Sequence, residues 1–259
     1  MKIRTTLSIV FILAVVLTNR AIAQTAVLTG AAKWADSAAR EIDAASDAGD
    51  LVRIRAARTN VDRALVAFPN DPYLLYYKAY ALFREAGLDE GMQHQEELRS
   101  VLDDEEKALD ASLAVKAFPE AHAMLSSVLG RKIAFRPIMA MVLGPKSGGE
   151  MSDAIALGPN NPRVWLLRGQ GAIFTPEQFG GGLTNAEAYL KKAEQLFAFD
   201  NATAPAPSWG RAELYAWLGQ VYQKQNKNAD AIAAYNKALE IDPNMRWVKF
   251  VLLPSTQKR

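Results

Sequence analysis

The sequence predicts an all-α fold, an α-solenoid of about five stacked antiparallel helix pairs with insertions. Apolar residues recur at the three- and four-residue spacing of helices along almost the whole chain, and the alternation typical of strands is almost absent. Asp-Pro and Asn-Pro steps recur between the helical stretches and divide them into similar units. We therefore expect one helical domain built from repeats.

The chain begins with "MKIRTTLSIVFILAVVLTNRAIAQ", which predicts a secretory signal peptide at residues 1–23. Basic residues precede a short apolar run, and Ala21-Ile22-Ala23 has the small residues of a cleavage site. An uncleaved anchor is the alternative, but the run is shorter than the roughly 20 residues of a spanning helix. Residues 24–259 should therefore form a periplasmic or secreted solenoid domain, with no stable membrane insertion of the mature chain.

Charge and cysteine content narrow the function further. The whole chain has 30 basic and 28 acidic residues, and removal of the signal peptide takes away three basic residues, Lys2, Arg4 and Arg20. The mature chain is then nearly neutral, which gives no reason to expect binding to nucleic acid or to an anionic membrane. The chain has no cysteine, so neither disulfides nor lipid attachment at an N-terminal cysteine is available.

The clearest repeat unit is the segment "AELYAWLGQVYQKQNKNADAIAAYNKALEIDPN". Small residues at the expected helix crossing alternate with aromatic residues that fill the space beside it, and a proline closes the unit: Tyr215, Leu218, Gly219, Tyr222, Ala231, Tyr235, Ala238 and Pro243. This segment resembles the tetratricopeptide repeat superfamily, most specifically at residues 212–245. The resemblance extends over most of residues 25–250.

Weaker units precede it. If Leu75, Leu125, Trp165 and Tyr215 are equivalent, the units are 50, 40 and 50 residues apart, against about 34 in the standard repeat, so each carries an insertion. Asp71-Pro72 and Asn161-Pro162 should each cap a helix and occupy its first turn.

Several further segments resemble exported bacterial repeat proteins of unassigned activity: "GPKSGGE", "NPRVWLLRG", "TPEQFGGG", "PSWG" and "WVKFVLLP". That resemblance implies a solenoid in a bacterial envelope and brings no catalytic residues.

The glycines at 180–182 precede a predicted helix, where an anion could bind. Thr175 with Gln178, and Thr184 with Glu187, are typical of capping boxes, so we interpret the glycines as a turn between two capped helices. No Lys-Ser or Lys-Thr follows them, as a phosphate loop requires. A loop that contacts a ligand stays open as an alternative, and "GPKSGGE" at 144–150 is expected to be a structural loop.

Catalytic and metal sites have little support. His94 and His122 have no partner at the spacing of a zinc-binding helix, and no serine lies in a nucleophile-elbow context. The acidic run "DDEEKALD" at 103–110 is typical of a solvated helix face. We expect no enzyme activity, no cofactor and no metal.

One helix carries an aromatic row on the face predicted to line the concave groove. Its members are Tyr73, Tyr76, Tyr80 and Phe83, with Arg84 beside them, and the equivalent groove positions downstream include Arg163, Gln170, Gln220 and Lys224. Such a face suits a protein or peptide partner. The alternatives are that other segments, such as the N-terminal helices or an insert near 87–105, cover the tyrosines, or that the protein is a small-molecule-binding accessory protein of the transporter-associated kind. A pocket closed by the inserts at 87–105 and 175–184 would favour the small molecule.

Overall fold

The computed structural model describes residues 30–89 and 95–257, and these residues form helices without any strand. The predicted signal peptide lies outside the described residues. Residues 30–47 form the first described helix, and the others follow in chain order: α2 (Leu51–Ala67), α3 (Pro72–Asp89), α4 (Gln95–Val115), α5 (Pro119–Phe135), α6 (Ala140–Leu157), α7 (Pro162–Ala172), α8 (Leu183–Phe197), α9 (Arg211–Lys224), α10 (Asn228–Ile241) and α11 (Leu253–Gln257). Short turns of other helix types are η1 (Pro137–Met139), η2 (Glu177–Phe179) and the π-helix η3 (Val248–Leu252).

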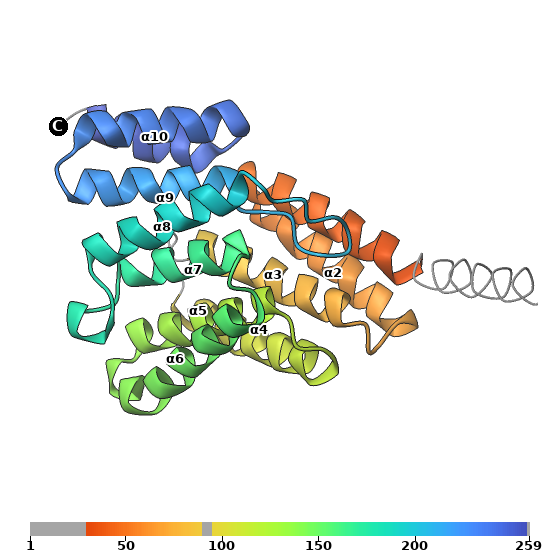
Figure 1. The fold of residues 1–259 in the computed structure, drawn as a ribbon. Coiled ribbons are helices and arrows are strands. Elements are labelled where there is room, and N and C mark those ends of the chain that lie inside the picture. Colours follow the sequence, from red (N-terminus) through yellow and green to blue (C-terminus); the bar gives the residue numbers. More distant parts are fainter. Residues whose placement is uncertain (1–29, 90–94, 258–259) are drawn as a thin grey trace, which may run out of the picture.

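Neighbouring helices form antiparallel pairs, and the pairs are stacked one after another (Figure 1). Residues 30–47 precede α2, and the next pairs are α3 with α4, α5 with α6, α7 with α8 and α9 with α10. The π-helix and α11 pack against the last pair. The predicted α-solenoid is therefore confirmed.

The helix capping predicted at the Asx-Pro steps, Asp71-Pro72 and Asn161-Pro162, is present. The Asp71 carboxylate accepts hydrogen bonds from the amides of Tyr73 and Leu74, and the Asn161 side chain accepts one from the amide of Arg163. Pro72 and Pro162 are the first residues of α3 and α7, where a missing N–H costs nothing. Each step therefore begins a repeat.

The insertions lie partly in the helices themselves. Helices α9 and α10 have 14 residues each, whereas α3 has 18 and α4 has 21. The "GPKSGGE" segment is also helical, because residues 144–150 lie within α6, so the expectation of a loop there was wrong. Hydrogen bonds from the Ser126 hydroxyl to the Ser147 carbonyl, and from the Ser147 hydroxyl to the Ser126 carbonyl, join α6 to α5 at this point.

The three glycines at 180–182 form a turn, but the predicted capping boxes are absent. Gly182 precedes α8 without a side-chain cap, and the Thr175 hydroxyl donates to the Gly171 carbonyl instead. Gly180 and Gly182 have φ of 82° and 90°, which favours glycine. Gly181 is required for a different reason, since a Cβ there would lie 1.8 Å from the Thr175 carbonyl oxygen.

Gly219 lies where α9 and α10 cross. A Cβ at this position would lie 2.3 Å from Cε1 of Tyr235, so the ring of Tyr235 occupies the space of a side chain. Gly169 has the equivalent contact with Leu190 in the preceding pair. In two repeats the helices therefore cross so closely that only a small residue fits, as predicted.

We expect Gly219→Leu to lower the free energy of unfolding by roughly 1–3 kcal/mol or more, because it overpacks this crossing. Gly130→Ala is the matched control, since Gly130 is an exposed residue inside α5 with nothing near its Cβ position. It should gain roughly 0.5–1 kcal/mol from helix propensity. Urea unfolding curves measure both, and a stabilised Gly219→Leu would contradict the crossing.

Candidate partner-binding cleft

The aromatic row on α3 is buried. Tyr76 and Tyr80 have 0% exposure and Phe83 has 7%, whereas Tyr73 is half-buried against Phe118. The structure therefore corrects the expectation that this row is an open face of the groove. Whether these residues contribute to partner binding stays a prediction.

The segment that covers the row is residues 198–210, the connection between α8 and α9, which we call the strap. Trp209 donates from its indole Nε1 to the Tyr76 hydroxyl at 2.9 Å, and its ring stacks on Tyr80 at 5.3 Å between centroids. The Tyr77 hydroxyl donates to the Pro205 carbonyl at 3.2 Å. Neither of the inserts predicted to close a pocket makes these contacts, so the strap was missed. The alternative that the N-terminal helices cover the tyrosines is correct in part, because Asp43 on the helix at residues 30–47 accepts a hydrogen bond from Tyr80.

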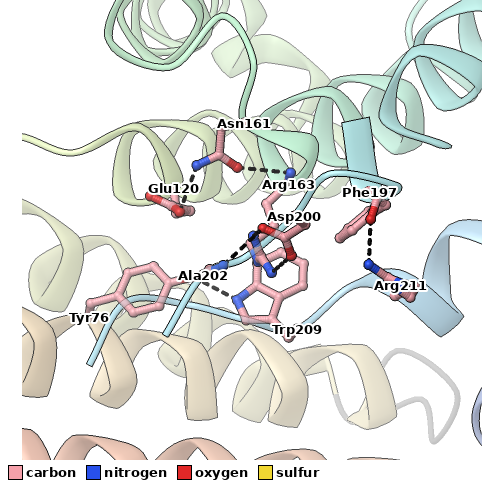
Figure 2. A network of polar contacts seen from close by, with 9 residues as sticks. All are labelled: Tyr76, Glu120, Asn161, Arg163, Phe197, Asp200, Ala202, Trp209 and Arg211. Atoms are coloured by element: carbon pink, nitrogen blue, oxygen red, sulfur yellow. Dashed lines mark hydrogen bonds and ion pairs between the residues drawn. The ribbon is translucent and has the colours of Figure 1, made fainter. Parts of the chain in front are cut away.

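Arg163 fastens the strap to α7 (Figure 2). Its guanidinium is buried and donates to both carboxylate oxygens of Asp200, at 2.6 and 3.2 Å. The Phe197 ring lies 5.6 Å from the guanidinium carbon, and Arg211 donates to the Phe197 carbonyl. Arg163 was predicted to face a partner, but it binds the protein's own strap.

Arg84 joins three parts of the fold. It lies on α3, donates to the Tyr80 hydroxyl, and pairs with Glu213 of α9. Asp43, on the helix at residues 30–47, lies 4.0 Å from the same guanidinium and accepts a hydrogen bond from Tyr80. This network holds the first described helix next to the last helix pair.

Beside this network lies an open cleft of about 700 Å³ between the first described helix and the residues that follow α10. Its rim carries four basic side chains and a phenylalanine: Arg40, Arg53, Arg246, Lys249 and Phe250. Phe250 is 57% exposed. We call this the end cleft.

A smaller cavity of about 130 Å³, which we call the chamber, shares two lining residues, Asp43 and Asp47, with the end cleft. Glu213, Asp242, Trp209 and Arg211 also line the chamber. Burial raises the pKa of Asp43 to about 6, although Arg84 opposes the shift. Burial, and then the negative charges of Asp242 and Glu213, raise the pKa of Asp47 to about 8. Perturbed carboxyl groups in a cleft favour a functional site.

The other predicted groove residues lie elsewhere. Gln170 and Gln220 are half-buried on α7 and α9, and Lys224 is exposed at the end of α9. Nearby, Trp217 contacts Phe174 and Trp247, with ring centroids 6.3 and 5.3 Å apart. The structure brings none of these three predicted residues into the end cleft.

The polar partners of His122 lie on the neighbouring helix, α6, and not on α5, which carries His122 itself. Its Nδ1 lies 2.7 Å from Oε2 of Glu150, and ligand atoms of His122, Glu150 and Asp153 lie within 4.8 Å of one another. These donor types could hold a divalent ion. The sequence spacing could not indicate the group, because it spans α5 and α6.

The geometry defines an α-solenoid of helix pairs in which the strap covers the tyrosine row of α3. Residues 212–245 match the family model for the tetratricopeptide repeat, the same boundaries that the sequence predicted. No curated protein matches the chain. Residues 212–245 therefore form a tetratricopeptide repeat, at the end of a solenoid of similar helix pairs.

Solved structures share this fold. One is the HusA haemophore from Porphyromonas gingivalis, which is 20% identical, with a TM-score of 0.60 and coverage of 74% of this chain and 94% of that one. Another is TTC0263, a thermophilic tetratricopeptide protein of Thermus thermophilus, which is 23% identical, with a TM-score of 0.58 and coverage of 81% and 93%. These likenesses establish the fold alone. Within the described residues, no helix is both long and apolar enough to cross a membrane.

We expect Trp209→Ala to lower the free energy of unfolding by roughly 3–5 kcal/mol, because Trp209 is 6% exposed and packs on the tyrosine row. Phe199→Ala is the matched control, since Phe199 lies on the same strap with 86% exposure. Its effect should stay within about 0.5 kcal/mol. Equal stability of the two variants in urea would show that the strap does not support the fold.

We expect Asp47→Asn to stabilise the protein increasingly as pH rises from 4 to 8. The folded-state pKa of Asp47 is raised to about 8, so its ionisation opposes folding and the parent loses stability across this range. Asparagine resembles the protonated acid and avoids that loss. Melting temperatures at pH 4 and pH 9 test this, with Asp104→Asn on the exposed face of α4 as control. A constant difference between Asp47→Asn and parent would contradict it.

Proposed function

We propose that this protein is an exported, non-enzymatic tetratricopeptide protein that binds a segment of a protein partner in the end cleft. The observation that carries the proposal is the end cleft itself, which stays open where the strap fills the neighbouring concave face. Solenoids of this kind present extended surfaces to partners. An exposed aromatic ring within a ring of basic groups is the kind of anchor that partner segments use.

Export rests on residues 1–23 of the sequence, which have the basic start, apolar run and small-residue site of a signal peptide. The proposed mature chain begins at Gln24 and acts in the periplasm or outside the cell. The near-neutral balance of that chain suits a protein partner better than nucleic acid.

A second candidate is the small-molecule-binding accessory protein. The volume of the end cleft, about 700 Å³, lies within the range of small-molecule pockets. One protein with the same fold is described as a haemophore, although its 20% identity carries no ligand over to this chain.

Site-specific photo-crosslinking separates these candidates. A photoreactive residue in place of Phe250, inside the end cleft, should give a crosslinked protein adduct in cells of the source organism. The intact mass of the exported protein should correspond to a chain that begins at Gln24. The control position is Phe179, which is 75% exposed on η2. The adduct at 250 should disappear when Arg246→Glu and Lys249→Glu are added.

Adducts of equal yield at both positions, or none at 250, would contradict the partner site. A small molecule that co-purifies with the parent and is lost from the Arg246→Glu, Lys249→Glu variant would favour the second candidate. If the membrane fraction contained the protein with the mass of the full, uncleaved chain, the proposal of export with cleavage would be contradicted.

A further inference from the structure

Helix α6 has little apolar packing to hold it on its neighbours. Ala154 is the only buried residue among its 18 residues, whereas α5 has eight. The larger apolar side chains of α6 that pack against the core, Leu143, Met151 and Ile155, are only partly buried. Three glycines and a proline lie inside this helix, and such residues weaken a helix. Contacts other than apolar packing must therefore contribute to holding α6 on α5.

Three metal-ligating side chains meet between these two helices. His122 of α5 has its Nδ1 2.7 Å from Oε2 of Glu150 on α6, and Asp153 follows three residues later, which places both carboxylates on one helix face. One ligand atom from each of the three lies within 4.8 Å of the other two. Ligand atoms at about 2.0–2.2 Å from one Zn²⁺ are roughly 3.3–3.6 Å apart in a tetrahedral site. Small side-chain rotations would therefore bring the three ligand atoms to one ion.

The hydrogen bond between His122 and Glu150 explains the positions of these two side chains but not that of Asp153. Asp153 brings a second carboxylate beside Glu150, and like charges on one helix face repel each other. Among the described residues, Asp153 belongs to no ion pair. Lys146 lies one turn before Glu150, but its ammonium is bound by Glu106 of α4 at 2.8 Å. A divalent ion would compensate both carboxylates while the neutral imidazole coordinates it.

The donor set favours zinc over magnesium or calcium. One imidazole nitrogen and two carboxylate oxygens are ligands that Zn²⁺ takes in sites with three protein ligands, where a water molecule fills the fourth position. Mg²⁺ and Ca²⁺ prefer six or more oxygen ligands. The side chains of His122 and Glu150 are 15% and 18% exposed, whereas Asp153 is exposed. The group is thus open to solvent on one side, where that water molecule can bind.

We propose that His122, Glu150 and Asp153 bind one zinc ion, which fastens α6 to α5. The ion joins the two helices where apolar packing is sparse, so its role is structural. This inference goes beyond the proposed function, because neither α5 nor α6 lines the end cleft. It replaces the expectation of no metal, which considered only ligands spaced along a single helix.

The test uses the mature chain without an affinity tag, after metal has been removed with a chelator. Competition with a chromogenic zinc indicator at neutral pH should give a Kd for Zn²⁺ of about 10 μM or tighter. Mg²⁺ and Ca²⁺ at about 1 mM should not displace the zinc, because the site offers too few oxygen ligands.

Three variants locate the ion. His122→Gln, Glu150→Gln and Asp153→Asn should each weaken zinc binding at least about tenfold, a difference of about 1.4 kcal/mol. Glu150→Gln is the most informative, because glutamine keeps a hydrogen bond to His122 and removes only the charged ligand. His94→Gln is the matched control, since His94 is the other histidine of the sequence and lies outside the described residues. It should keep the parental affinity, and melting temperatures show that each variant is folded.

The fastening of α6 has a measurement of its own, amide hydrogen exchange followed by mass spectrometry. At a free zinc concentration of about ten times the Kd, opening of α6 away from its site should become about tenfold rarer in the parent. Exchange of the α6 amides should slow by the same factor. Glu150→Gln should show no slowing at that zinc concentration.

No zinc binding by the parent at about 100 μM, or parental affinity in Glu150→Gln and His122→Gln, would overturn the inference. Equal weakening by His94→Gln would also overturn it, because the ion would then not be bound by the three residues between α5 and α6. Zinc binding at the three residues without slower exchange in α6 would overturn the fastening role. The crosslink at position 250 tests the proposed function separately, since it requires no zinc.

Discussion

The pairing of the strap with the tyrosine row is the interaction on which the concave face of this solenoid depends. Helix pairs stacked in an arc leave apolar side chains on their inner side, and on α3 these are large aromatic rings. Trp209 covers them with a hydrogen bond and a stacked ring, although it lies 133 residues away in sequence. The row is thereby part of the hydrophobic core, and the protein's own chain occupies the place where a bound peptide is expected in an open groove.

Two charged groups fix the strap in position. Arg163 is among the largest fully buried side chains, and its charge is compensated by Asp200 at the start of the strap. Breaking a buried pair by removing one partner typically costs about 3–5 kcal/mol, since the other charge is left uncompensated. The pair therefore makes the path of the strap specific, because another path would leave Arg163 buried without its carboxylate.

The sequence predicts the repeats well because their determinants are local. Gly219, Gly169 and the Asx-Pro steps act through contacts within one helix pair, so spacing alone identifies them. The wrong predictions concern features whose determinants lie far apart in the sequence. Helical phase indicates which face of α3 carries Tyr76 and Tyr80, but it cannot indicate which distant segment covers that face. The glycines of α6 suggested a loop, yet the contacts with α5 hold the segment as a helix.

The end cleft was missed for the same reason, and its composition explains why no motif could indicate it. Asp43 and Asp47 come from the beginning of the described chain, whereas Asp242, Arg246 and Phe250 come from near its end. Arg84 brings these two regions together by bridging the first described helix and α9. The strap contributes Trp209 to the wall of the chamber, so the chamber exists only when the strap lies on the tyrosine row. A site made in this way depends on the contacts that hold the first described helix beside α9.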